Sequence, residues 1–326
     1  MRIMRRLLDI LDLASPSPTV ETLAGRYRGA MLGLAAGNVL GLPVEGYPRT
    51  LIARHHPEGL RDIPREEKRL PWDDDLAQAV ILAESIVEFD RLEVEDLASR
   101  LLAWRRANGR GMGHLTRRVL DAIENGASPH DAARVVWEDT GKNAAGNGAV
   151  MRCAPAALRW RRDPERLVAE TNRSALATHF DPRCGWSSVV VNIAIAAALE
   201  GRRVDPADLA DAVDEAGAPA AVGSAVRASA GVILDALVLD HDNSMGYTLK
   251  AMQAGLWALE QDGSAEETLI AIVNAGGDTD TNGAVAGAAL GALHGESALP
   301  KRWIENIAGT SELTDLAEQL LERATG

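Results

Sequence analysis

Hydrophobic positions recur at spacings of three and four along most of the chain, which is the period of one face of an α-helix. The run from Val189 to Leu199 begins with three valines, which is typical of a strand, but its length and alanine content favour a buried helix. The Asn-Gly pairs at Asn125, Asn147 and Asn282 adjoin helical patterns, so we expect no β-hairpin there. The pattern predicts an all-α protein, a compact bundle of about a dozen helices.

Several predicted helices begin with capping signals. Ser128–Pro129 and Asp205–Pro206 each place a capping side chain before a proline, and Ser264 and Glu267 have the spacing of a capping box. The longest stretch that we expect to be irregular runs from Gly41 to Pro71 and is rich in glycine and proline. Loops of that length often form lids or binding loops.

The N-terminus has a basic start, but Asp9 and Asp12 interrupt the apolar run that a signal peptide needs. We expect residues 1–20 to form an amphipathic extension or a short helix. Residues 21–326 show no break in composition and are expected to form one domain. No uninterrupted run of about 20 apolar residues is present, so we expect no membrane span.

Composition narrows the possible functions. The chain has 326 residues, 46% of them hydrophobic, and a net charge of -13, which argues against general nucleic-acid binding because phosphate contacts need Lys and Arg. Cys153 and Cys184 provide neither a disulfide framework nor a CxxC motif. They fit a reducing compartment, so we expect a cytoplasmic location. The sequence does not indicate an oligomeric state.

Acidic residues gather in two distant segments. Asp73–Asp75 stand at the start of an apolar helical segment, where helix capping alone would explain them. Asp278, Asp280 and Thr281 follow paired glycines and precede a helix of small apolar residues. If the two segments meet, five carboxylates repel one another unless cations neutralise them. Oxygen ligands without His or Cys fit hard cations such as Mg²⁺ or Mn²⁺, and two of them about 3.5–4 Å apart suit this number of carboxylates.

Two further segments are candidates for the same site. Glu45 follows a turn spaced by glycines, and an ordinary surface glutamate is an equally good reading of it. Backbone N–H groups of Gly146–Gly148 are suited to a phosphate or a ribose, although a turn at a helix start has the same pattern. For Arg152 we favour a structural role as an ion-pair partner.

Together these segments resemble the ADP-ribosylglycohydrolase family over roughly residues 24–305. GGDTDT, a distant acidic helix start and GNGxxMRxxP form a specific combination. The matching segments follow the family's order and are Arg28–Gly37, the loop ending at Glu45, Asp74–Asp75, Gly111–Thr116, Gly146–Pro155, Thr178–His179, Gly277–Thr281 and Pro300–Trp303.

The resemblance implies an all-α fold with two divalent cations, Mg²⁺ or Mn²⁺, in a cleft. The catalytic residues we expect are Glu45, Asp75 and Asp278. The metal ligands it implies are Asp74, Asp75, Asp278, Asp280 and Thr281, to which Asp73 could add a carboxylate. The ADP-ribose pocket it implies is lined by Gly111, Gly113, Gly146, Asn147, Gly148 and His179.

The chain departs from the family's pattern at a few of these positions. Asp73 and Leu76 replace the threonines that usually flank the Asp-Asp pair, and Asn38 replaces an aspartate. Ala144–Ala145 leave no hydroxyl or aromatic ring beside the Gly-Asn-Gly segment. We therefore expect a metal site that is intact but modified.

The predicted function is hydrolysis of the glycosidic bond between ADP-ribose and an acceptor, either a protein side chain or a small molecule. Water would be activated at the dinuclear centre, with Glu45 as general acid or base. One alternative is a catalytically silent protein of the same fold that binds ADP-ribose or has a structural role. Another is a dinuclear phosphohydrolase that acts on a nucleotide.

Overall fold

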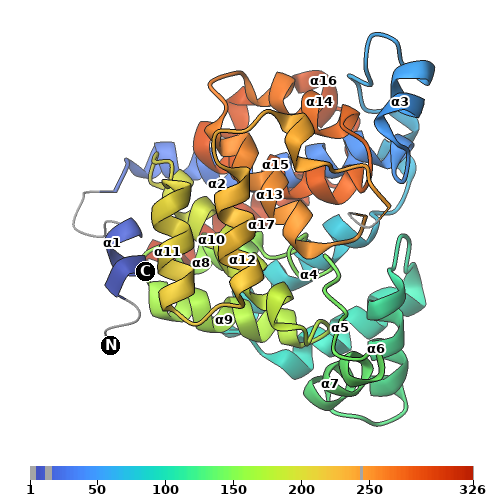
Figure 1. The fold of residues 1–326 in the computed structure, drawn as a ribbon, viewed down its shortest axis with the longest axis vertical. Coiled ribbons are helices and arrows are strands. Elements are labelled where there is room, and N and C mark those ends of the chain that lie inside the picture. Colours follow the sequence, from blue (N-terminus) through green and yellow to red (C-terminus); the bar gives the residue numbers. More distant parts are fainter. Residues whose placement is uncertain (1–4, 12–16, 243–244, 326) are drawn as a thin grey trace.

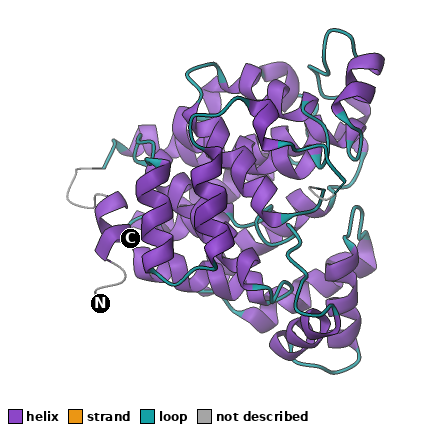
Figure 2. Ribbon diagram, viewed as in Figure 1, coloured by secondary structure: helices purple, strands orange, loops and turns teal. Residues whose placement is uncertain are grey.

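The computed structural model describes residues 5–11, 17–242 and 245–325, and this part of the chain is built from helices and loops (Figure 2). Apart from two isolated bridges it contains no β-structure, which confirms the all-α prediction. The described α-helices are α1 (Arg5–Leu11), α2 (Val20–Gly41), α3 (Arg49–His55), α4 (Asp74–Phe89), α5 (Val94–Ala107), α6 (His114–Glu124), α7 (Pro129–Asp139), α8 (Ala154–Trp160), α9 (Pro164–Leu176), α10 (Pro182–Leu199), α11 (Pro206–Glu215), α12 (Ala220–Ser229), α13 (Thr248–Glu260), α14 (Ala265–Asn274), α15 (Thr279–His294), α16 (Lys301–Ile304) and α17 (Thr310–Thr325). Short 3-10 turns are η1 (Leu42–Val44), η2 (Arg65–Arg69), η3 (Leu234–Leu237) and η4 (Glu296–Ala298). The helices outnumber the expected dozen because many run for only one to three turns.

The run of valines near residue 189 lies in α10 and is buried, as its alanine content predicts. Among the described helices, α10 alone is long and apolar enough to cross a membrane, and 83% of its apolar stretch is buried inside the protein. The predicted caps are also present. Ser128 Oγ accepts a hydrogen bond from the Asp131 N–H, and Ser264 Oγ accepts one from the Glu267 N–H.

The segment from Gly41 to Pro71 is less irregular than predicted. It contains η1, α3 and η2, although loops still occupy the rest of it. Prolines at Pro48 and Pro64 precede α3 and η2, because their fixed φ suits the entry to a helical turn. Proline content therefore marked helix starts here as well as loops.

Helices α2 and α15 form the centre of the bundle and make its most extensive helix contact (Figure 1). Both are buried on nearly all sides, and glycines repeat every four residues along each of them. A Cβ added at Gly33 would lie 2.2 Å from the Gly287 carbonyl oxygen, and one added at Gly287 would lie 2.0 Å from the Gly33 oxygen. The two backbones thus touch directly, and this contact fixes the end of α2 against the start of α15.

Helix α1 packs against α11. Leu7 and Leu11 are buried, and Arg6 forms ion pairs of 2.8 Å with Asp211 and with Glu215. The predicted boundary between residues 20 and 21 stays a prediction. Residues 1–4 and 12–16 of the expected extension, Asp12 among them, lie outside the described residues.

Candidate active site

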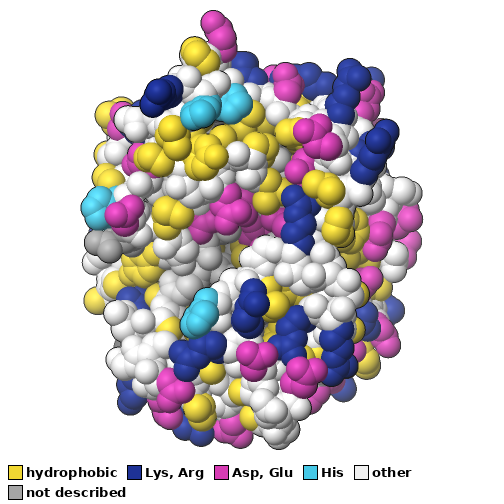
Figure 3. Space-filling view, turned by 90° about the vertical axis from the view of Figure 1, so that its right-hand side faces the viewer, with side chains coloured by type: hydrophobic (Ala, Val, Ile, Leu, Met, Phe, Trp, Pro, Cys, Tyr) yellow, Lys and Arg dark blue, Asp and Glu magenta, His cyan; other side chains and the backbone are white. Residues whose placement is uncertain are grey.

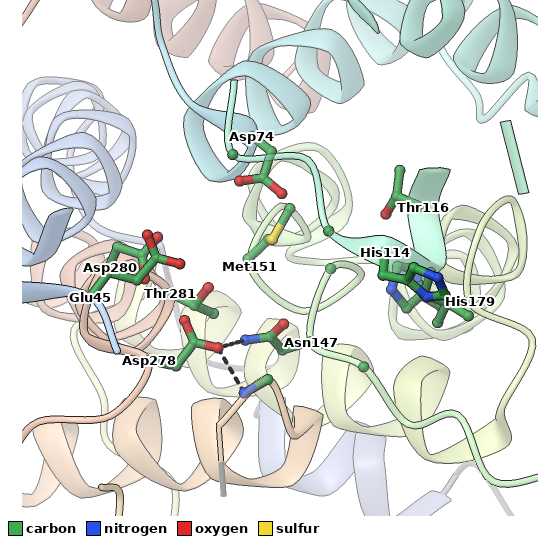
Figure 4. A pocket seen from close by; sticks show the side chains of 16 residues that line it. Glu45, Asp74, His114, Thr116, Asn147, Met151, His179, Asp278, Asp280 and Thr281 are labelled. Atoms are coloured by element: carbon green, nitrogen blue, oxygen red, sulfur yellow. Dashed lines mark hydrogen bonds between the residues drawn. The ribbon is translucent and has the colours of Figure 1, made fainter. Parts of the chain in front are cut away.

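A cavity of about 260 Å³ opens on one face of the molecule, where Figure 3 shows acidic side chains gathered in a hollow below a cluster of hydrophobic side chains. Its walls come from the loop that follows η1 and from the loops that lead into α6, α8 and α15, and Figure 4 shows their side chains converging. The predicted residues that line it are Glu45, Asp74, Gly111, Gly113, Gly146, Asn147, Gly148, His179, Asp278, Asp280 and Thr281. Asp73 and Asp75 lie beneath it and are buried.

The two acidic segments meet. Carboxylate oxygens of Asp73, Asp75 and Asp280 lie within 4.8 Å of one another, and so do those of Glu45, Asp278 and Asp280. Asp280 therefore belongs to both groups, one beneath the cavity and one on its wall. The Thr281 hydroxyl donates a hydrogen bond to Asp75 Oδ1 at 3.1 Å, while Asp74 belongs to neither group and faces the cavity (Figure 4).

Helix capping does not explain these aspartates. Asp73 and Asp278 occupy the N-cap positions of α4 and α15, yet neither side chain forms a capping hydrogen bond. The Asn38 amide instead donates to Asp73 Oδ2 at 2.9 Å and to Asp75 Oδ2 at 3.0 Å. Neutral donors thus hold the carboxylates in place without cancelling their charge.

The Asp278 carboxylate is held by the opposite wall of the cavity. The side-chain amide of Asn147 donates to Asp278 Oδ2 at 2.7 Å, and the Gly246 N–H donates to the same oxygen at 2.9 Å (Figure 4). The Gly-Asn-Gly segment therefore orients an acid through its asparagine side chain. Sequence reasoning had considered only its backbone.

The electrostatics of the cluster favour bound cations. Burial, reinforced by neighbouring carboxylates, raises the pKa of Asp75 and Asp280 well above the ordinary value and raises the pKa of Asp74 to about 7. Within the described part of the chain, no Lys or Arg forms an ion pair with these three aspartates. Asp73 Oδ1 and Asp280 Oδ1 are buried without a hydrogen-bond partner. Unsatisfied buried oxygens in an oxygen-only donor set fit hard divalent cations.

Backbone hydrogen bonds made by two glycines connect the loop that carries Glu45 to the loop that carries Asp278. The Gly46 N–H donates to the Gly277 carbonyl, and the Gly277 N–H donates to the Tyr47 carbonyl, both at 2.9 Å. Gly277 has a φ of +80°, and a Cβ there would lie 2.1 Å from the Leu239 carbonyl oxygen. Only glycine fits this turn, which explains the paired glycines before the acids.

Glycines also make room around His179 and Asp74. A Cβ on Gly148 would lie 2.6 Å from His179 Cε1, and a Cβ on Gly111, at a φ of +79°, would lie 2.5 Å from Asp74 Oδ1. Gly113 has no atom within 4 Å of such a position and forms the N-cap of α6. Gly148 and Gly111 thus allow the His179 and Asp74 side chains to pack directly against the backbone of the cavity wall.

The prediction that Arg152 is an ion-pair partner is wrong. Its side chain is fully buried, and its guanidinium donates to Gln78 Oε1, the Ser174 carbonyl and Thr178 Oγ1. None of these acceptors is a carboxylate. Neutral oxygens accept from both terminal nitrogens of the guanidinium, while Nε is buried without a hydrogen-bond partner among the described residues. No second buried charge is brought in, and burial lowers the pKa of Arg152 to about 10.

Sequence reasoning missed several residues of the site. His114, Leu115, Thr116, Met151 and Gly246 line the cavity. All but Gly246 belong to the segments that carry the family resemblance, so their place in those segments could have identified them as site residues.

A second hollow, of about 530 Å³, adjoins the cavity. Tyr247 and Arg183 line it, with the guanidinium 5.8 Å from the centre of the Tyr247 ring. The Thr248 N–H donates to the Ala145 carbonyl, which places Tyr247 beside the two alanines that lack a ring of their own. The aromatic side chain of this region thus comes from a distant segment.

Comparison with known proteins confirms the family resemblance seen in the sequence. The ADP-ribosylglycohydrolase family profile matches residues 19–326. ADP-ribosylarginine hydrolase Tri1 from Serratia proteamaculans is 28% identical over 94% of this chain and 81% of its own length. The ADP-ribosyl-[dinitrogen reductase] glycohydrolase of Rhodospirillum rubrum is 26% identical over 89% of this chain and 92% of its own. A solved structure, titled ADP-ribosylglycohydrolase-related protein complex, is 30% identical with a TM-score of 0.75, covering 94% of this chain and all of that one.

An all-helical fold with an oxygen-only carboxylate cluster at the floor of a cavity defines a class of candidate metal-dependent hydrolases. Within that class the family is identified by the comparisons, because the matched profile spans nearly the whole chain. The protein belongs to the ADP-ribosylglycohydrolase family.

Proposed function

We propose that this protein hydrolyses the glycosidic bond between ADP-ribose and an acceptor side chain, with two divalent cations, Mg²⁺ or Mn²⁺, held by the carboxylate cluster. The observation that carries the proposal is the position of Asp280, which joins both carboxylate groups and keeps one buried oxygen without a partner. The named relatives that act on ADP-ribosylated substrates support the substrate class.

Asp73, Asp75 and Asp280 would hold one cation, and Asp278 and Asp280 the other, because these oxygens converge in two groups. Glu45, whose carboxylate borders the second group, is left for proton transfer. Bound there, such cations supply Lewis-acid activation of water and neutralise the surrounding carboxylates. The protein's own part is to fix these groups before substrate arrives. Asn38 and Asn147 do so through the hydrogen bonds described above.

Glu45 is the group that we assign to proton transfer. It lies on the cavity wall, and desolvation together with the Asp278 and Asp73 carboxylates raises its pKa. A glutamate with a raised pKa can accept or release a proton closer to neutral pH than an ordinary carboxyl group. Its loop is fixed to the Gly277 turn, so the carboxylate keeps its position relative to Asp278.

The adjoining hollow would accommodate the adenosine half of the substrate. Gly146, His114 and Gly246 border both spaces, so a ligand can extend from one to the other. The Tyr247 ring provides an aromatic surface for a base, and stacking of this kind contributes about 1–3 kcal/mol per base.

The test is a panel of ADP-ribosyl-arginine and ADP-ribosyl-serine peptides, incubated with Mg²⁺ or Mn²⁺ and read by mass spectrometry. We expect release of intact ADP-ribose, abolished by chelator and by Asp280→Asn, which keeps the side-chain shape but removes the charge. Asp262→Asn is the matched control, because Asp262 is exposed and distant from the cavity.

The outcomes separate the alternatives. Release of ADP-ribose in excess chelator would refute the metal-dependent mechanism. ADP-ribose binding without turnover of either peptide would identify a silent binding protein. Phosphate as the product, in place of ADP-ribose, would identify a phosphohydrolase.

A further inference from the structure

A buried chain of hydrogen bonds leads from Arg152 to the cavity. The Arg152 Nη2 lies 2.7 Å from Thr178 Oγ1, and Thr178 Oγ1 lies 2.8 Å from His179 Nδ1. All three side chains are at most 2% exposed. The direction of each hydrogen bond in this chain can be derived from the chemistry of its members.

Arginine can only donate, so Thr178 Oγ1 accepts from Arg152. A hydroxyl has a single proton, and among the described residues Oγ1 forms no hydrogen bond with any acceptor other than His179 Nδ1. That proton is therefore donated to His179 Nδ1. A neutral imidazole that accepts at Nδ1 has its own proton on Nε2.

The far side of the ring faces the cavity. His179 lines it, and Nε2 has no hydrogen-bond partner in the described part of the protein. Positions on Gly148 and Gly146 that a Cβ would occupy lie 2.9 and 3.4 Å from Nε2, so glycines leave that edge uncovered. Burial and the nearby Arg152 charge lower the pKa of His179 to about 3, which keeps the ring neutral.

We infer that Arg152 and Thr178 are positioning residues that lock His179 in its Nε2–H tautomer, so that it donates a hydrogen bond to an oxygen of the bound ADP-ribose. The role rests on the proposed function for the identity of the ligand. It excludes His179 as a general base and as a metal ligand, since both need a free lone pair on Nε2.

The first test reads the tautomer by ¹⁵N NMR of the ligand-free protein at neutral pH, with the His179 signals assigned from His179→Gln. We expect protonated Nε2 and an Nδ1 that accepts a hydrogen bond. Thr178→Val, which keeps the side-chain shape, should remove the hydrogen-bond signature at Nδ1, and Thr178→Ser should retain it. A ring protonated at Nδ1, a charged ring, or a Thr178→Val spectrum like the wild type would overturn the inference.

The second test measures ADP-ribose binding by calorimetry. A glutamine amide can reach the position of Nε2–H, whereas an asparagine amide reaches only that of Nδ1. We expect His179→Gln to bind ADP-ribose with an affinity within about threefold of the wild type. His179→Asn and Thr178→Val should bind it about tenfold more weakly, which corresponds to the loss of roughly one hydrogen bond.

Equal binding by the Gln and Asn variants would overturn the inference. Absence of turnover with binding intact would count against the proposed catalysis alone. Absence of binding by the wild type would refute the proposed ligand, and the spectra would then decide the tautomer.

Discussion

The contact between α2 and α15 makes a quantitative prediction for Gly33→Ala. The added Cβ would lie 2.2 Å from the Gly287 carbonyl oxygen. Ordinary van der Waals contact begins at 3.4 Å, so the two atoms would be about 1.2 Å too close. The obstacle is backbone, so no side-chain rotation relieves it, and the helices must separate. Overpacking of a rigid core costs about 1–3 kcal/mol or more, and this contact belongs at the upper end of that range.

Gly25→Ala is the matched control, because Gly25 lies in the same helix and has no atom within 4 Å of the added Cβ. There alanine should stabilise the protein by about 0.5–1 kcal/mol, as it does in a helix generally. Urea unfolding followed by circular dichroism measures both free energies. We expect Gly33→Ala to be less stable than Gly25→Ala by about 3 kcal/mol or more.

The same displacement should reach the active site, since α2 carries Asn38 and α15 carries Asp280. Gly37→Ala tests this most directly, because its Cβ would lie 1.9 Å from the Gly283 oxygen, one turn from the carboxylates. Its melting temperature should rise less on addition of Mg²⁺ or Mn²⁺ than that of the wild type. If Gly33→Ala were as stable as Gly25→Ala, direct backbone contact between these helices would be refuted.

Three further predictions concern the site. Burial raises the pKa of Asp74 to about 7, so the metal-free fold binds a proton that the unfolded chain releases, and this contribution to stability is lost as pH rises from about 4 through 7. A bound cation neutralises the ionised carboxylate, so the rise in melting temperature caused by Mg²⁺ should become larger between about pH 5 and pH 8. A rise in melting temperature that is the same at every pH would contradict this prediction. Asn38→Asp removes hydrogen bonds to the Asp73 and Asp75 carboxylates and should destabilise the chelated protein by about 3–6 kcal/mol in urea unfolding, with partial recovery in Mg²⁺. Tyr247→Ala should weaken ADP-ribose binding about tenfold in calorimetry while Tyr247→Phe keeps it, and equal affinities would exclude the ring from the ligand site.

Sequence could predict those features of the fold that depend on local spacing. Helix period, proline position and capping side chains act over a few residues, which is why α10 and the start of α14 were predicted correctly. The sequence predicted a helix of small apolar residues after Thr281, but it did not show that α2 was its packing partner. That choice depends on matching glycine rows in helices separated by more than 200 residues.

For the site, residue types indicated the chemistry and the fold supplies the connections. Five aspartates predicted a need for cations, yet nothing local shows that Asn147 holds Asp278 or that Tyr247 lies beside Ala145. Arg152 was misassigned because a lone arginine in an apolar stretch suggests a buried ion pair. Only the folded chain shows that its partners are an amide, a carbonyl and a hydroxyl.

The departures from the family's pattern are related in space. The family's aspartate is replaced at Asn38, and a family threonine is replaced at Asp73, so the charge lost at one position is gained at the other. These two side chains touch, with the Asn38 amide 2.9 Å from Asp73 Oδ2. Leu76, the third departure, is fully buried in the hydrophobic core. Measured against the pattern that the sequence resembles, the expected number of carboxylates beneath the cavity is unchanged, and what differs is the helix that carries one of them. Because cation binding depends on the local sum of charge as well as on its exact placement, these substitutions favour a retained metal site over a lost one.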